Sequence, residues 1–298
     1  MRIYLSAFSE RSLISYLNYF NKTKLNILIS FALRQSHYYS LIKNYKSNIN
    51  SLILDSGAYT KNNAQSELLK KSITFEGYKE FCKIFRNDFD FAFNFDVNFN
   101  QDGFSDNLYY LKQLEQEGLN PVPVLHDYIN TEAKYYIEKG YPITALGFSE
   151  DKKKIYFKPI IEEFHKANKK IHLLGKSNFD DLYDAPVAYS DSSSWAQNQR
   201  FACISFWCKS KPGRNKSETI HFRDMDVARI KRSNWYDDYK YRDDLEEYLD
   251  DSFGFKYYDL MDIDTYRERR EIVNVHHFVM LQDIITKEHA ARGWTFDT

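Results

Sequence analysis

Three aspartates, Asp55, Asp96 and Asp191, each stand where a short apolar stretch of the sequence ends. A carboxylate at the end of an apolar run must find hydrogen-bond donors or face a cavity, because burying it unpaired is costly. One carboxylate can serve as a nucleophile while a second moves protons, so carboxylates gathered at one site support covalent group transfer. The alternative is ordinary turn or helix-cap chemistry, which also favours Asp and Ser.

The apolar runs before these aspartates belong to a series of eight candidate strands. Most are rich in Ile, Leu, Val, Phe or Ala and carry few charges, which is typical of parallel strands buried on both faces. The strands are predicted at 2–7, 25–31, 51–56, 89–96, 121–126, 143–148, 170–175 and 186–191. Helices are predicted between them, among others at 107–117, 131–139 and 155–167, with Gly118 and Gly140 as helix stops.

Eight strand-and-helix units within about 200 residues predict an α/β fold, a (β/α)₈ TIM-type barrel. A doubly wound open sheet is the alternative, because a strand count from one sequence is uncertain. In a barrel, polar residues at the strand ends converge on the C-terminal face, where active sites are built. The polar residues at these ends are Ser30, Asp55, Asp96, His126, Gly147 with Ser149, Gly175 with Ser177, and Asp191.

Beyond the barrel core, assigned to residues 1–205, we expect residues 206–298 to form a helical C-terminal extension packed on it. Residues 209–232 contain eight basic and three acidic residues, a local excess of five positive charges. This segment predicts contact with phosphates, although a solvated helix face is the alternative. The role of the acidic, Tyr-rich segment 237–251 is left open. The candidate nucleic-acid-binding residues are Lys209, Lys211, Arg214 and Lys216.

Composition excludes several classes of protein. The chain has 41 Lys and Arg against 42 Asp and Glu, a formal charge of −1, which excludes a globally basic nucleic-acid coat. Hydrophobic residues at 43% and aromatic residues at 17% supply a core and exclude wholesale disorder. Its three cysteines cannot pair completely, which indicates a reducing compartment. Without a signal peptide or a run long enough to span a membrane, a soluble, cytoplasmic protein is expected.

No pattern in the sequence points to a metal or an organic cofactor. Cys203 and Cys208 have no second closely spaced pair, and adjacent His276 and His277 would point in different directions on a helix. The sequence has no Walker-type loop and no glycine-rich dinucleotide fingerprint. A cysteine nucleophile would lack an evident histidine partner. We therefore expect no metal site and no cofactor.

Six short motifs, taken in order, give the chain a resemblance to a known family. They are LDSGAY with Asp55, FNFD with Asp96, PVPVLHD, ALGF, HLLGK, and YSDSSSW with Asp191. Across residues 50–205 the chain resembles the guanine transglycosylases, and the VNVHHFVML stretch near Val275 adds a fainter similarity. These are barrel enzymes that exchange a guanine base in nucleic acid for a 7-deazaguanine.

The resemblance implies a role for each of the three aspartates. Asp191 corresponds to the nucleophile that attacks the anomeric carbon of the target nucleoside and forms a covalent aspartyl-glycosyl intermediate. Asp55 corresponds to the acid/base residue, and Asp96 to the aspartate that recognises the edge of the purine. These roles agree with the chemistry, since a carboxylate nucleophile divides base exchange into two displacements.

The resemblance also suggests which residues contact the base. Gly147 corresponds to the glycine whose backbone contacts it, and Gly175 of HLLGK is placed with the substrate-binding residues. His126 stands where the tRNA enzymes of the family usually have Gln. Tyr59 and Trp195 are candidates for stacking on the base, with plain core packing as the alternative.

Two departures from the bacterial tRNA enzymes favour DNA as the substrate. The chain lacks the closely spaced cysteines of their C-terminal zinc site, and SSSW follows Asp191 where they have a Pro-Thr-Arg type sequence. Both departures are similar to the shorter relatives, found in phages and bacterial modification islands, that insert 7-deazaguanines into DNA. The resemblance therefore implies a pentosyltransferase that acts on DNA with a base such as 7-cyano-7-deazaguanine, in the host cytoplasm if a phage encodes it.

Three other functions are left open by the sequence. A zinc-free tRNA-guanine transglycosylase would use the same residues on tRNA. A glycoside hydrolase or N-glycosylase would use paired carboxylates on the same barrel. A non-catalytic nucleic-acid-binding barrel would depend on the basic segment alone.

Overall fold

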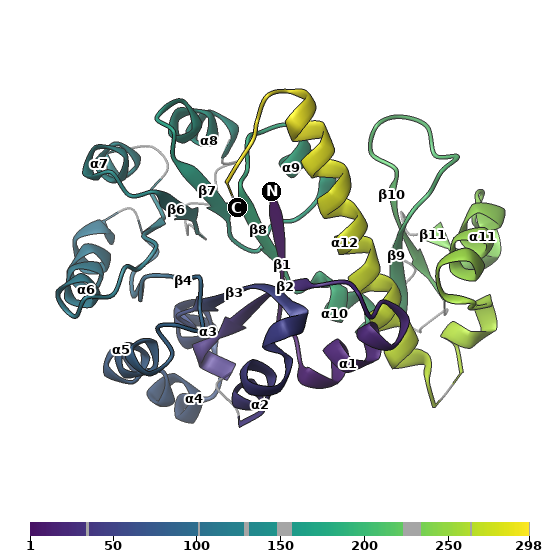
Figure 1. Ribbon diagram of the computed structural model, residues 1–298, viewed down its shortest axis with the longest axis horizontal. Helices are drawn as coiled ribbons and strands as arrows, with labels where there is room; N and C mark the ends of the chain where they lie inside the picture. The colour runs from purple at the N-terminus through teal and green to yellow at the C-terminus, as the bar shows by residue number, and fades with distance from the viewer. Residues whose placement is uncertain are drawn as a thin grey trace. The chain divides into compact units, whose positions relative to one another are not determined.

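The computed structural model describes residues 1–33, 36–100, 102–127, 131–147, 157–222, 234–262 and 264–297. The chain divides into two compact units (Figure 1). The first comprises Met1–Phe8, Lys24–Ser192 and Glu288–Thr298, and the second Ser9–Thr23 and Ser193–Lys287. These bounds differ from the expected division after residue 205. The chain leaves the first unit directly after its eighth strand and returns to it for residues 288–298.

Eight parallel strands of the first unit form one sheet in the order β4-β3-β2-β1-β8-β7-β6-β5. Each strand overlaps one of the eight runs that the sequence predicts, and several strands are shorter than their run. The strands are β1 (Arg2–Ser6), β2 (Leu25–Ser30), β3 (Ile49–Asp55), β4 (Phe91–Ala92), β5 (Val124–Leu125), β6 (Ile143–Leu146), β7 (Lys170–Leu173) and β8 (Tyr189–Ser192). The pairing of β1 with β8 brings the first and last strands of the sheet together.

The remaining edges of the sheet, β4 and β5, are joined by a short seam. Phe93, directly after β4, forms a parallel bridge with Val122, just before β5. The Val122 N–H donates to the Ala92 carbonyl (2.8 Å), and the Asn94 N–H donates to the Val122 carbonyl (2.9 Å). These bonds close the ring of eight strands. The predicted (β/α)₈ barrel is confirmed.

Helices follow the strands around the barrel, as the right-handed βα connection requires (Figure 1). Gly140, with φ of +82°, ends α7, and Gly118, with φ of +72°, follows α6, so both predicted stops are confirmed. The helices of this unit are α2 (Ser36–Tyr45), α3 (Ala58–Asn63), α4 (Glu67–Ser72), α5 (Phe75–Ile84), α6 (Phe104–Gln116), α7 (Glu132–Lys139), α8 (Phe157–Lys166) and α9 (Phe179–Tyr183).

The interior of the barrel is a packed core. Its aromatic members, Tyr4 on β1, Phe93 after β4 and Tyr189 on β8, are buried, and aliphatic side chains from the other strands surround them. Phe296, from residues 288–298, packs against the same cluster. Because the interior is filled, a site for a ligand must be built at the ends of the strands.

The second unit combines a small sheet with helices, so the extension contains strands as well as the expected helices. Strand β9 (Cys203–Trp207) is antiparallel to β10 (Ser217–His221), which pairs with β11 (Asn234–Trp235). The helices are α1 (Glu10–Tyr19), α10 (Ser194–Arg200), α11 (Arg242–Phe253) and most of α12 (Tyr266–Ala291). None of the helices in the described part of the chain is long and apolar enough to cross a membrane.

Candidate active site

The three aspartates lie at the carboxyl ends of strands β3, β4 and β8. Asp55 is the last residue of β3, Asp191 lies within the four residues of β8, and Asp96 follows β4. Burial raises the pKa of Asp55 most, and the charges of Asp191 and Asp96 raise it further, so both of these carboxylates lie within electrostatic range of Asp55. The structure therefore brings together the three residues that the sequence places at separate strand ends.

Asp55 is held through one of its two carboxylate oxygens. Ser30 Oγ donates to Asp55 Oδ2 (2.7 Å), and the Gly57 N–H donates to the same oxygen (3.0 Å). The second bond is an Asx turn, so the turn interpretation is confirmed for this residue, and its role in a site stays a prediction. Oδ1 has no hydrogen-bond partner among the described residues. Burial raises the pKa of Asp55 to about 6, against the two hydrogen bonds that lower it, so the carboxyl titrates in the range that acid/base catalysis uses.

Asp96 is buried and contacts two polar side chains. Asn94 Nδ2 donates to Asp96 Oδ1 (2.7 Å), and His126 Nε2 lies 3.4 Å from Asp96 Oδ2. Burial raises the pKa of Asp96, whereas His126 and Asn94 lower it. An ionised carboxylate only accepts hydrogen bonds, so Asp96 can take N–H donors from a ligand.

Flat rings extend from His126 toward the surface. The His126 ring stacks on Phe99 (centroids 4.8 Å apart, 28° between planes), and Tyr59 lies parallel to Phe99 at 6.5 Å. Tyr59 is 55% exposed, so this end of the row of rings lies at the surface. Gly147 makes room for this arrangement, since a Cβ there would lie 2.7 Å from His126 Cε1 and 2.6 Å from Val124 Cγ1. The predicted contact of the Gly147 backbone with a base stays a prediction.

Trp195 does not belong to this group of rings. Its side chain is only 2% exposed and lies in the second unit, at the start of α10. A buried indole cannot stack on a base, so the core-packing alternative is the correct one for Trp195.

Asp191 is also held through one oxygen. Its Oδ1 lies 3.0 Å from His172 Nε2 and accepts the Gly175 N–H at 3.0 Å. Ser177 Oγ donates to the backbone carbonyl of Asp191 (2.9 Å), which fixes the main chain at this point. In the described part of the chain Asp191 Oδ2 has no hydrogen-bond partner. Asp191 thus has one fixed oxygen and one that is available, and Gly175 acts on the carboxylate of Asp191.

Two functional candidates were not predicted from the sequence. His172 contacts Asp191. The only feature of the sequence that could have pointed to His172 is that it places a polar ring in a short, largely apolar strand. Glu132, the first residue of α7, is buried and accepts the N–H groups of His126 (3.1 Å) and Asp127 (2.8 Å). Burial raises the pKa of Glu132 to about 7. Glutamate is common in the first turn of helices. The sequence around Glu132 therefore does not distinguish this buried glutamate from an exposed one at a helix start.

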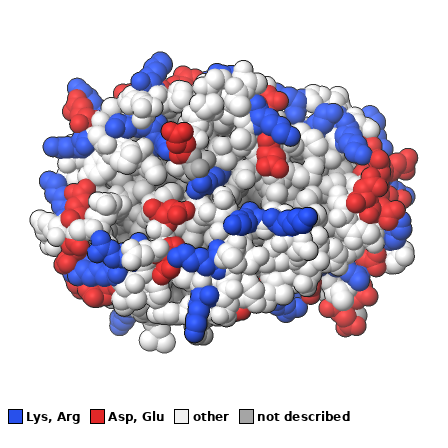
Figure 2. All heavy atoms as spheres, in the orientation of Figure 1, with Lys and Arg blue, Asp and Glu red and all other residues white. Residues whose placement is uncertain are grey.

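The basic segment of the second unit is partly neutralised by acidic neighbours. Lys209 pairs with Glu247 (2.9 Å), Lys211 pairs with Glu218 (2.6 Å), and Lys216 donates to the Lys209 carbonyl (2.7 Å). Figure 2 shows acidic side chains gathered over α11, the helix that carries Glu247 and most of the acidic segment 237–251. Arg214 is exposed, and the other four basic residues of the segment lie outside the described residues: Arg223, Arg229, Lys231 and Arg232.

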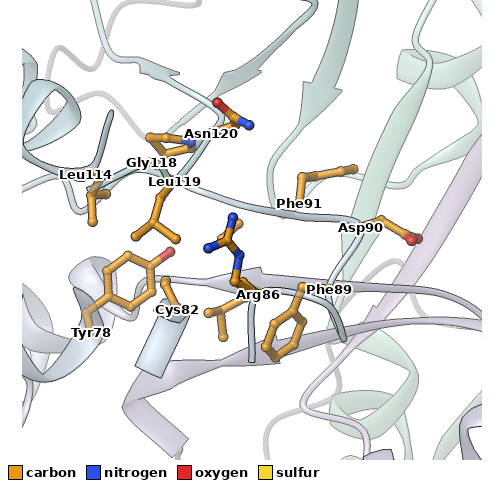
Figure 3. A pocket seen from close by; sticks show the side chains of 13 residues that line it. Tyr78, Cys82, Arg86, Phe89, Asp90, Phe91, Leu114, Gly118, Leu119 and Asn120 are labelled. Atoms are coloured by element: carbon orange, nitrogen blue, oxygen red, sulfur yellow. The ribbon is translucent and has the colours of Figure 1, made fainter. Parts of the chain in front are cut away.

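A pocket in the described part of the chain lies outside the carboxylate cluster. Within the described ranges, no group of three His, Cys, Asp or Glu side chains is placed to hold a metal ion. A pocket between β4 and helices α5 and α6 is lined among others by Tyr78, Cys82, Arg86 and Asp90, and the Arg86 side chain points into it (Figure 3). None of the candidate site residues lines this pocket.

Comparison with known proteins finds only distant likenesses. No family model and no curated protein matches the chain. A mandelate racemase/muconate lactonizing protein from Herpetosiphon aurantiacus covers 64% of this chain and 54% of its own, with 9% identity and a TM-score of 0.38. An enolase from Pseudomonas fluorescens Pf0-1, solved with magnesium, potassium and tartrate, covers 64% and 43%, with 11% identity and a TM-score of 0.33. The chain spans about half the length of these structures, and likeness at this level supports no inference about the site.

Proposed function

We propose that the chain is a base-exchanging transglycosylase that replaces guanine in DNA with a 7-deazaguanine base. The observation that carries this proposal is the carboxylate cluster at the barrel's C-terminal face. In it, Asp191 and Asp55 each have one oxygen fixed by two polar neighbours and the other without a partner in the described residues. The assignment of the individual roles and the choice of DNA rest on the resemblance of the motifs.

In the first displacement, Asp191 Oδ2 attacks C1′ of the target nucleotide. The bond from Oδ2 to C1′ forms, the C1′–N9 bond breaks, and the departing guanine takes a proton from Asp55. A pKa of about 6 leaves a useful fraction of Asp55 protonated near neutral pH. The product of this step is the aspartyl-glycosyl ester and free guanine.

In the second displacement, the incoming base loses its N9 proton to the ionised Asp55. Its N9 attacks C1′, the ester bond breaks, and the Asp191 carboxylate is regenerated. Asp55 ends the cycle protonated, as it began, so the exchange needs no oxidant, reductant or cofactor. The first half-reaction therefore needs Asp55 protonated and the second needs it ionised. A pKa near the working pH makes both forms available.

Asp96 suits the recognition that both half-reactions require. Guanine and 7-deazaguanines present the same edge, with the N1–H and the exocyclic amine as donors, and differ only at position 7. A carboxylate that accepts both donors thus binds the leaving and the incoming base alike. His126, whose Nε2 lies 3.4 Å from Asp96 Oδ2, helps to orient that carboxylate.

DNA contact is assigned to the basic strip, which we define as Lys209, Lys211, Arg214 and Lys216. The Lys209–Glu247 pair does not preclude this role, because exposed ion pairs contribute little and can be exchanged for phosphate. The Lys211–Glu218 pair is more buried, so Lys211 would have to leave a partly buried partner to reach a phosphate. The target nucleotide would have to leave the helical stack before Asp191 could reach its sugar.

Nucleoside mass spectrometry of cells that express the protein, supplied with 7-cyano-7-deazaguanine, tests the proposal. We expect the modified nucleoside in DNA from cells with the wild-type protein and none with the Asp191→Asn variant, which loses the nucleophile but keeps its volume. Loss of a covalent nucleophile costs several orders of magnitude in rate. Modification found only in tRNA would favour the tRNA alternative, and guanine release without an incoming base would favour an N-glycosylase. Equal incorporation by Asp191→Asn would remove Asp191 from the mechanism.

A further inference from the structure

We infer that His172 is the positioning residue of Asp191: its Nε2–H holds Oδ1 and so leaves Oδ2 as the oxygen that attacks the sugar. The inference deepens the proposed function, and its kinetic consequences rest on it. The contact itself is a feature of the fold, with His172 on β7 and Asp191 on the neighbouring strand β8.

His172 is a polar ring in the centre of the aromatic core. Its side chain is completely buried, and its ring packs against both Tyr4 (centroids 5.8 Å apart, 30° between planes) and Tyr189 (6.3 Å, 23°). The Phe93 ring meets it edge-on at 4.9 Å. Burying an imidazole among such rings is unfavourable unless its polar atoms are used. An apolar ring would fill this core without burying polar atoms. What a histidine provides here, and an apolar ring would not, is the contact with Asp191.

The surroundings also determine which nitrogen carries the proton. An ionised Asp191 can only accept, so His172 Nε2, 3.0 Å from Oδ1, must be the donor. His172 Nδ1 is buried and has no hydrogen-bond partner within the described residues. A proton on Nδ1 would leave a buried N–H without an acceptor, which is costly. His172 is therefore a neutral ring protonated at Nε2.

This arrangement has a consequence for both displacements. The Nε2–H of His172 and the N–H of Gly175 both act on Oδ1, so two donors fix the carboxylate plane and leave the lone pairs of Oδ2 free. In the ester intermediate Oδ1 is the carbonyl oxygen and keeps both donors. When the ester breaks, negative charge returns to the carboxylate and the same donors stabilise it. His172 should thus affect the rate of glycosyl transfer and not the binding of the base.

Three variants separate this role from core packing. His172→Phe keeps a ring in the aromatic core but removes the donor, and His172→Gln restores an N–H near the Nε2 position. Tyr4→Phe changes the same core by removing only a hydroxyl, which bonds Ser51 and not the Asp191 carboxylate. We expect His172→Phe to lower kcat about 10- to 100-fold, the usual loss for a hydrogen bond to a charged group, with an unchanged KM for the incoming base. His172→Gln should recover most of the loss, and Tyr4→Phe should behave as the wild type. A folded His172→Phe with wild-type kcat, or with only a raised KM, would overturn the inference.

A second measurement does not depend on activity. Nitrogen-15 NMR of the imidazole reports its tautomer, and the His172 signals are identified by their loss in His172→Gln. We expect a neutral ring protonated at Nε2, with shifts that change in Asp191→Ala. A ring protonated at Nδ1, or one indifferent to Asp191→Ala, would overturn the inference even if His172→Phe fails to fold. If the wild type exchanges no base while the NMR result holds, the proposed function fails and the positioning contact stands.

Discussion

The buried carboxyl of Glu132 should make the stability of the protein depend on pH in a way that one substitution removes. Burial raises its pKa from 4.5 to about 7, although the backbone N–H groups of His126 and Asp127 lower it. The folded state therefore holds the proton more tightly than the unfolded state. Below about pH 4.5 both states carry the proton and nothing is lost. As the pH rises toward 7, the buried group must ionise, and the free energy of unfolding falls.

The size of this effect follows from the shift in pKa. A difference of about 2.5 pKa units, at about 1.36 kcal/mol per unit, corresponds to a loss of about 3 kcal/mol between pH 4.5 and pH 7. Single domains are stable by about 5–15 kcal/mol, so the loss is measurable. Glu132→Gln keeps a carbonyl that can accept the N–H groups of the turn and removes the ionisation.

Urea unfolding of wild type and Glu132→Gln, each measured at several pH values, isolates the contribution of this residue. Other buried carboxyls also titrate in this range, and taking the difference between the two proteins cancels them. We expect the wild type to lose about 3 kcal/mol relative to Glu132→Gln as the pH rises from 4.5 to 7. Glu67→Gln, at the exposed first position of α4, is the matched control and should leave the pH dependence unchanged. A difference that stays flat across this range would refute the argument.

Two further predictions concern the carboxylate cluster and its support. Formation of the covalent adduct in a single turnover requires protonated Asp55. The rate of adduct formation should therefore fall about tenfold per pH unit above pH 6, and Asp55→Asn should remove that dependence. A rate that rises through pH 6 would contradict this role. Gly147→Ala places a methyl group 2.7 Å from His126 Cε1, which should cost about 1–3 kcal/mol of stability and weaken base binding, measured by urea unfolding and by titration with the free base. Wild-type values in both measurements would show that His126 can move aside without loss.

The strands were predictable because burial on both faces leaves a local signal. Runs such as 25–31 and 143–148 correspond closely to β2 (Leu25–Ser30) and β6 (Ile143–Leu146). The run 89–96 forms a strand only at Phe91–Ala92, because the residues beyond the Phe93 bridge leave the sheet and carry Asp96 into the site. Residue types therefore predicted where each strand lies in the sequence, but not the residue at which its hydrogen bonding to the next strand stops.

What the sequence did not predict depends on contacts that each residue makes outside its own helix or strand. Glu132 acquires its role from backbone N–H groups of a turn outside its helix, and His172 from a carboxylate on the next strand. Residues 9–23 join the second unit because the Phe20 ring stacks on His276 of α12 (4.4 Å, 11°). No local pattern encodes a stack between residues so far apart in the chain.

The division of the barrel unit along the chain has a consequence for its synthesis on the ribosome. Residues 288–298 belong to the barrel unit: His289 contacts the Leu182 carbonyl (2.7 Å), and Phe296 packs on the core cluster. Residues 193–287 must be translated between β8 and this segment, which takes roughly 5–20 s at about 5–20 residues per second. Throughout that interval the nascent barrel has all eight strands, but the apolar surface that Phe296 covers stays exposed to solvent. The length of the second unit thus sets how long chaperones have to shield this surface.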